Sequence, residues 1–122
     1  MGILASKLTK SNLTKEDVNE ISQEVIKRIT SNSNPVLIYL FGSAADMSMT
    51  MASDFDFAII FFDDIDSKKE KKHILNMKLF PDIHLDLLFF KMSDFQRKAD
   101  IGGVCWEIKN RGKIVYDQRA KV

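Results

Sequence analysis

Apolar residues first recur every three or four positions and later gather in continuous runs. The helical spacing is carried by Val18, Ile21, Val25 and Ile29. With Thr14 and Asp17 as a helix-start capping arrangement, this spacing predicts a helix over residues 14–31. The polar segment 31–35 ends in proline and breaks the helix. The continuous apolar run 36–41 that follows is typical of a buried strand.

Shorter patterns predict the remaining elements. They are a strand at 54–62, a helix at 68–79 with Ser67 as its cap and Pro81 after it, a strand at 83–90, a helical turn from Ser93, a helix at 102–111 and a closing strand at 113–116. Ile74 and Leu75 are expected to face the core, and Gly112 to end the last helix in the left-handed conformation. Strands that alternate with helices indicate an α/β or α+β fold, with helices covering a small mixed sheet.

Length and composition narrow the class of protein. The chain has 122 residues, so we expect one domain over 1–122 with 1–13 as a flexible N-terminal segment. The 18 basic and 17 acidic residues nearly cancel, so no overall field recruits nucleic acid. The lysines within 68–72 are interpreted as a solvated helix face. No apolar run approaches the roughly 20 residues of a membrane span.

Cys105 is the only cysteine, which excludes an internal disulfide and suits a reducing compartment. Together with the lack of a recognisable signal peptide, this predicts a cytoplasmic protein. Cys105 lies next to Trp106 in an apolar stretch, and both side chains are expected in the core.

Three carboxylates and a Gly-Ser pair are the candidate chemistry. Asp54 and Asp56 lie two residues apart at the start of a predicted strand, so their side chains share a face. Asp86 lies within an apolar strand, where an unpaired carboxylate is costly, so a cation or hydrogen-bond donors are expected near it. Oxygen ligands of this kind favour Mg²⁺ or Mn²⁺ over zinc. Gly42 would let the backbone approach a phosphate, and Ser43 would offer its hydroxyl and amide.

Each acidic residue also has a structural interpretation. Asp54 alone is compatible with a turn at a strand start, and Asp56 with an exposed position on an edge strand. His84 lies two residues before Asp86 and is either a neighbour of the site or a participant in it. The joint pattern, with Gly42 ahead of the two aspartates, favours the metal site.

The sequence around these residues resembles a known family. Leu40-Phe41-Gly42-Ser43, ten intervening residues and then Asp54-Phe55-Asp56 is similar to the signature of the minimal nucleotidyltransferases, which belong to the DNA polymerase beta-like superfamily. Asp86 matches the family's third carboxylate on a later apolar strand. The tail 108–116 resembles the closing helix, glycine and short strand. The resemblance covers residues 15–117.

This resemblance implies an enzyme that binds a metal–nucleotide. Asp54, Asp56 and Asp86 would hold the catalytic Mg²⁺ or Mn²⁺ ions, and Asp86 would help to deprotonate an attacking hydroxyl. Gly42 and Ser43 would bind the β- and γ-phosphates. The implied reaction is transfer of a nucleoside monophosphate, AMP from ATP first of all, to a hydroxyl of a protein or small molecule, with release of pyrophosphate.

The resemblance also implies a partner. Relatives commonly work beside a separate helical protein of the HEPN type, in some systems as the antitoxin that modifies and silences an RNase toxin. A chain this short has no second domain to bind the acceptor, so a HEPN-type protein or a self-dimer is expected to complete the site.

One departure from the family pattern keeps an alternative open. Many relatives carry basic residues and a glycine after the Gly-Ser pair, whereas residues 44–47 here are Ala-Ala-Asp-Met. The alternative is a catalytically degenerate module that keeps the fold and binds a helical partner. Lys113, Arg111 or Arg97 could otherwise supply the missing positive charge.

Overall fold

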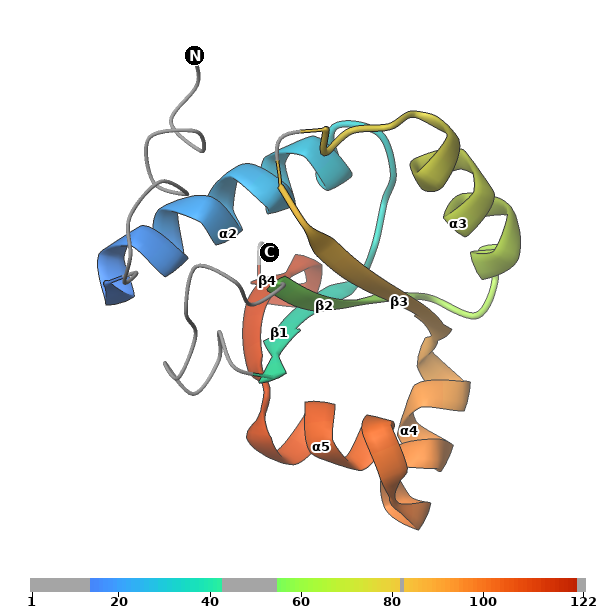
Figure 1. Cartoon of the computed structure of the whole chain (residues 1–122). Coiled ribbons are helices and arrows are strands. Elements are labelled where there is room, and N and C mark those ends of the chain that lie inside the picture. Colours follow the sequence, from blue (N-terminus) through green and yellow to red (C-terminus); the bar gives the residue numbers. More distant parts are fainter. Residues whose placement is uncertain (1–13, 43–54, 82, 121–122) are drawn as a thin grey trace.

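The computed structural model describes residues 14–42, 55–81 and 83–120 (Figure 1). In chain order its elements are α2 (Lys15–Thr30), β1 (Leu37–Phe41), β2 (Phe55–Phe61), α3 (Ser67–Asn76), β3 (Leu85–Lys91), α4 (Met92–Ile101), α5 (Gly103–Arg111), β4 (Lys113–Asp117) and the 3₁₀ turn η2 (Gln118–Ala120). Every predicted helix and strand in these ranges is present, within a few residues of its expected bounds. The predicted fold class, a small mixed sheet covered by helices, is confirmed.

The strands form one sheet in the order β3-β2-β1-β4. β1 is antiparallel to both β2 and β4, whereas β2 and β3 are parallel. The C-terminal end of β1 therefore lies at the same edge of the sheet as the N-terminal ends of β2 and β3. Figure 1 shows α2 on one side of this sheet and α4 and α5 on the other.

Alternation along β2 divides the core into two layers. Phe55, Phe57, Ile59 and Phe61 pack with α2, while Ala58 and Ile60 pack with α4 and α5. All six of these side chains are buried, and each large one contributes about 1.5–3 kcal/mol to folding. A shift of one residue would reverse both sets. The hydrophobic pattern therefore fixes the face toward which Asp56 points.

Helix ends follow the predictions in part. Thr14 and Asp17 form the reciprocal cap of α2, with N–H to side-chain oxygen distances of 3.0 and 3.1 Å. The cap of α3 is Asp66 and not Ser67. α3 ends at Asn76, before Pro81 is reached. The prediction for Leu75 was wrong because α3 buries only Ile74, and Leu75 is 52% exposed.

Two predictions for the last helix were also wrong. Gly112 has φ −77° and is extended rather than left-handed. A glycine still suits the position, because a Cβ there would meet the carbonyl oxygens of Ile108 and Leu40. Trp106 is 38% exposed and not a core residue. Cys105 is buried as predicted, and burial raises the pKa of its thiol.

None of the helices within the described ranges is long and apolar enough to cross a membrane.

Asp63 caps the start of α4 from a distant part of the chain. Lys91, at the N-cap position, provides no side-chain cap. Asp63 Oδ1 instead accepts a hydrogen bond from the Ser93 N–H at 3.0 Å. The Ser93 N–H, followed by the Ser93 side chain, holds the pKa of Asp63 below its ordinary value of 3.8. Asp63 therefore links the turn after β2 to the start of α4.

Replacement of Asp63 by Ala is expected to destabilise the protein in a pH-dependent way. Because the folded-state pKa is lowered, the contribution is present above the unfolded-state pKa and is lost as the pH falls through the folded-state pKa. Urea unfolding of the wild type and Asp63→Ala, from neutral pH down to about pH 3, measures the difference. The difference between the two free energies of unfolding should become smaller as the pH falls toward the acidic end. Asp64→Ala, which leaves the hydrogen bond between Asp63 and Ser93 in place, is the matched control for the loss of one carboxylate from this turn.

Candidate functional site

Three strands meet where the predicted site residues lie. Phe41 at the end of β1 is the register partner of Asp56, and Asp56 is the register partner of Asp86 in β3. Neighbouring strands are about 4.8 Å apart. The structure therefore places Asp56 between the end of β1 and Asp86, although Asp86 is thirty residues away in the sequence.

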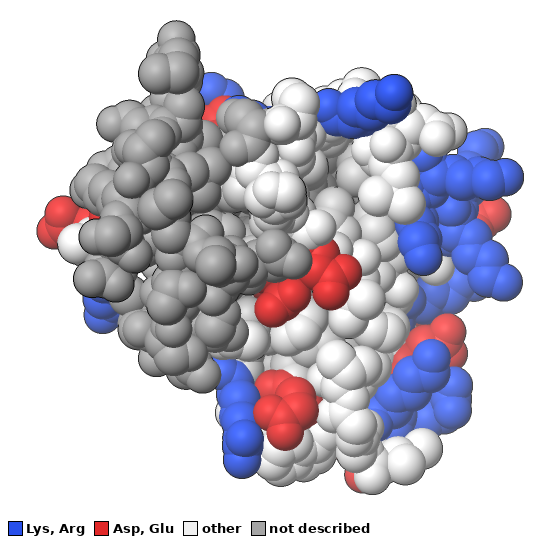
Figure 2. All heavy atoms as spheres, viewed as in Figure 1, with Lys and Arg blue, Asp and Glu red and all other residues white. Residues whose placement is uncertain are grey.

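The two carboxylates share one face of the sheet. Asp56 is two residues before Ala58 and so lies on the face of β2 that packs toward α4 and α5. Asp86 is two residues before Leu88 and lies on the same side of the sheet. Asp56 is half-buried and Asp86 is exposed. In Figure 2 acidic side chains gather near the middle of the face, over β2 and β3, while basic side chains lie mainly toward its margins.

The expectation that Asp86 needs a compensating group because of burial was wrong. Among the strands of the described ranges, β3 lies at one edge of the sheet and pairs with β2 alone. The Asp86 side chain is exposed, so water can solvate its charge. Its apolar neighbours pack on the sheet without enclosing it.

Gly42 brings the backbone directly against Asp56. Its φ is +72°, a left-handed conformation that glycine adopts without strain. A Cβ at this position would lie 2.5 Å from Oδ2 of Asp56. Only glycine therefore allows both this turn after β1 and the observed position of the carboxylate.

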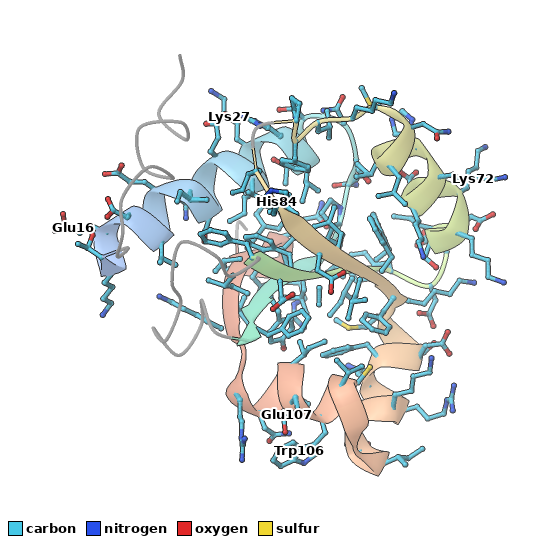
Figure 3. All side chains as sticks on the ribbon, viewed as in Figure 1. Glu16, Lys27, Lys72, His84, Trp106 and Glu107 are labelled. Carbon is cyan, nitrogen blue, oxygen red and sulfur yellow. The ribbon has the colours of Figure 1, made fainter. Side chains whose placement is uncertain are left out.

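Several predicted positions lie outside the described residues. These are Ser43, Asp54 and the segment 44–47, so the predictions for them stay predictions. Within the described ranges, no group of three His, Cys, Asp or Glu side chains is arranged to hold a metal ion. His84 is exposed and lies just before β3 (Figure 3).

Two hollows adjoin the site residues. One of about 560 Å³ is lined by Phe41, Gly42, Val104, Glu107 and Arg111, and so joins the end of β1 to α5. The other, of about 530 Å³, lies between α3 and β3; its lining includes Ile74, Leu75, Phe80, Leu85, Leu87 and Asp86. The first carries opposite charges, whereas the second is mainly apolar. The sequence pattern did not indicate Glu107, although its i,i+4 spacing from Arg111 was a detectable signal.

The donor chemistry of the described residues fits a hard divalent cation. Asp56 and Asp86 offer carboxylate oxygens from neighbouring strands, and a few such ligands leave positions for phosphate oxygens and water on Mg²⁺. The close approach of the Gly42 backbone leaves space beside Asp56 that a side chain would fill.

Comparison with known proteins assigns the family. A family model described as polymerase beta, nucleotidyltransferase, matches residues 23–121. The chain belongs to the polymerase beta nucleotidyltransferase family. This membership agrees with the resemblance of the residues around Gly42 and Asp56. No curated protein matches the chain.

Solved structures of nucleotidyltransferases and antitoxins share the fold of this family member. A protein of Sulfolobus solfataricus assigned as a nucleotidyltransferase aligns with a TM-score of 0.60 and 14% identity, over 98% of this chain and 92% of the other. A toxin–antitoxin complex with AMP-PNP aligns with a TM-score of 0.55 and 22% identity. A mutant of the toxin–antitoxin pair MntA–HpeT gives 0.53 and 20%. Each of these two alignments covers 81% of this chain and 75% of the other.

Proposed function

We propose that this nucleotidyltransferase-family protein transfers a nucleoside monophosphate, with ATP as its first candidate substrate, to a hydroxyl group of a protein or small molecule. The observation that carries the proposal is the register of β1, β2 and β3. It places the Asp56 and Asp86 carboxylates side by side and the Gly42 backbone against Asp56. Family membership supports the reaction class.

The proposed reaction is an in-line displacement. The acceptor hydroxyl oxygen attacks the α-phosphorus, the bond between the α-phosphorus and the bridging oxygen breaks, and pyrophosphate leaves. Asp86 is exposed at the edge of the sheet, so it can accept the hydroxyl proton from an acceptor that approaches from solvent. Asp56 lies between Asp86 and Gly42, where it can orient the reacting centre.

Asp56 and Asp86, with Asp54 as the predicted third ligand, would hold Mg²⁺ or Mn²⁺. A bound divalent ion would supply charge stabilisation for the phosphate oxygens and the leaving group. Gly42, with Ser43 as predicted, would offer backbone amides to the β- and γ-phosphates.

We further propose that the acceptor side is completed by a second protein, a helical HEPN-type toxin for which this chain is the antitoxin. Two structural neighbours are toxin–antitoxin complexes, and one contains AMP-PNP. The mainly apolar hollow between α3 and β3 has Asp86 in its lining, so a partner seated there would lie beside that carboxylate. A self-dimer is the alternative way to complete the site.

Titration with nucleotides tests the proposal without knowledge of the acceptor. Calorimetry with the Mg²⁺ complexes of ATP, CTP, GTP and UTP is expected to give saturable binding, with ATP the tightest ligand, and EDTA should abolish it. The absence of binding at millimolar nucleotide, in a folded protein, would contradict the proposal and favour the degenerate binding module.

Transfer is then measured with ATP labelled at either the α- or the γ-phosphate. The α-label is expected to appear on the acceptor, with release of pyrophosphate, whereas the γ-label should not. A neighbouring reading frame that encodes a small all-helical protein identifies the first acceptor to test. Transfer of the γ-label would show phosphoryl transfer and contradict the proposed reaction.

A further inference from the structure

The triphosphate proposed to bind near Gly42 needs positive charge, and the sequence offers three candidates for it. Arg97 lies on α4 and pairs with Asp94 at 3.4 Å. Lys113 opens β4 and is the register partner of Leu40. Of the three, only Arg111 lies in the described lining of the hollow that contains Gly42.

Helix geometry explains why Arg111 reaches this hollow. Val104, Glu107 and Arg111 are spaced three and four residues apart on α5 and line the same hollow, as residues on one helical face do. β4 follows α5 after Gly112 and pairs with β1 in antiparallel register. This connection brings the C-terminal end of α5 to the end of β1, where Gly42 lies.

Arg111 is loosely held in the described structure. Its Nη1 lies 3.6 Å from Oε2 of Glu107, with the two side chains 72% and 51% exposed. Its Cζ lies 5.7 Å from the centre of the Trp106 ring; Figure 3 shows Trp106 and Glu107 as neighbours on α5. An exposed ion pair of this kind contributes little to stability, so an incoming phosphate can replace Glu107 as partner of the guanidinium at little cost.

We propose that Arg111 is the cation that binds the β- and γ-phosphates of the nucleotide, and that Glu107 is its partner when no nucleotide is bound. This inference rests on the proposed function. A guanidinium can donate two parallel hydrogen bonds to phosphate oxygens. The Glu107 carboxylate, which lines the same hollow, opposes the triphosphate by charge repulsion. Removal of Arg111 and removal of Glu107 therefore have opposite effects on nucleotide affinity.

Calorimetric titration of MgATP and of AMP into four full-length proteins tests the inference: the wild type, Arg111→Gln, Glu107→Gln and Arg97→Gln. Arg111→Gln is expected to weaken MgATP binding about tenfold and to leave AMP binding unchanged, since the guanidinium donates charge-assisted hydrogen bonds to phosphates that AMP lacks. Glu107→Gln is expected to tighten MgATP binding about threefold, by loss of one repulsive charge. Arg97→Gln is the matched control, because Arg97 is also an exposed, paired arginine, and it should bind as the wild type does.

The outcomes separate this inference from the function on which it rests. If the wild type binds MgATP and Asp56→Asn does not, while Arg111→Gln binds normally, the role of Arg111 is overturned and the nucleotide site stands. Equal losses for MgATP and AMP in Arg111→Gln would also overturn it. AMP lacks the β- and γ-phosphates, so the effect of Arg111 would then not depend on them. If the wild type binds no MgATP, both proposals fail. Thermal unfolding of each variant confirms that the compared proteins are folded.

Discussion

Asp56→Asn is expected to abolish metal-dependent nucleotide binding and to reduce nucleotidyl transfer on the order of a thousandfold or more. Asp56 lies at the centre of the site, between Phe41 and Asp86 in register and against Gly42. The substitution keeps the size of the side chain but removes the charge that would hold Mg²⁺. Metal-based charge stabilisation contributes several kcal/mol, and each 1.4 kcal/mol corresponds to a tenfold change in rate. Calorimetry with MgATP and the α-label assay measure the two effects.

Asp86→Asn provides an informative comparison with Asp56→Asn. Asp86 is exposed on the edge strand and is proposed to accept the hydroxyl proton. Its substitution should reduce transfer strongly. Because Asp86 is also a proposed metal ligand, MgATP affinity should fall too, but less than in Asp56→Asn, since the Asp86 side chain is the more exposed of the two. Asp64→Asn, on the exposed turn after β2, is the charge-matched control and should change neither. Normal MgATP binding by a folded Asp56→Asn variant would contradict the assignment of Asp56 as a metal ligand.

The sequence predicted the elements well because their signals are local. The helical spacing of α2 and the Thr14–Asp17 cap depend on residues within one or two turns. Likewise, the alternation along β2 determines which of its side chains pack on each face. The bounds of α3 were less predictable, because its exposed lysines leave Ile74 as its only buried residue.

Properties that depend on distant pairing could not be predicted in the same way. The apolar residues around Asp86 suggested an enclosed carboxylate, but whether a strand is central or outermost depends on strand order. Likewise, Arg111 and Gly42 line the same hollow because β1 pairs with β4 in antiparallel register. The pattern formed by Gly42 and Asp56 could be recognised in the sequence, because the residue types that the chemistry needs occur in the same order as in the family's signature. Their contact, however, comes from the pairing of β1 with β2.

Gly42→Ala is expected to lower both the stability of the protein and its affinity for MgATP. At φ +72° an alanine is strained by about 1–2 kcal/mol. In addition, its Cβ would lie 2.5 Å from Oδ2 of Asp56, so the carboxylate must turn away from its observed position. We therefore expect a loss of stability of at least the conformational cost and a loss of MgATP affinity of tenfold or more. Urea unfolding and calorimetry measure these two effects.

Gly103→Ala separates the two causes. Gly103 has φ +75°, close to that of Gly42, but a Cβ there would meet nothing within 4 Å. It should therefore show the conformational cost with normal MgATP binding. In an Asp56→Ala background, which lacks the carboxylate, the stability cost of Gly42→Ala should fall to that of Gly103→Ala. If the cost of Gly42→Ala is the same with and without the carboxylate, contact with Asp56 is not what requires glycine at this position, and the conformation of the turn alone explains it.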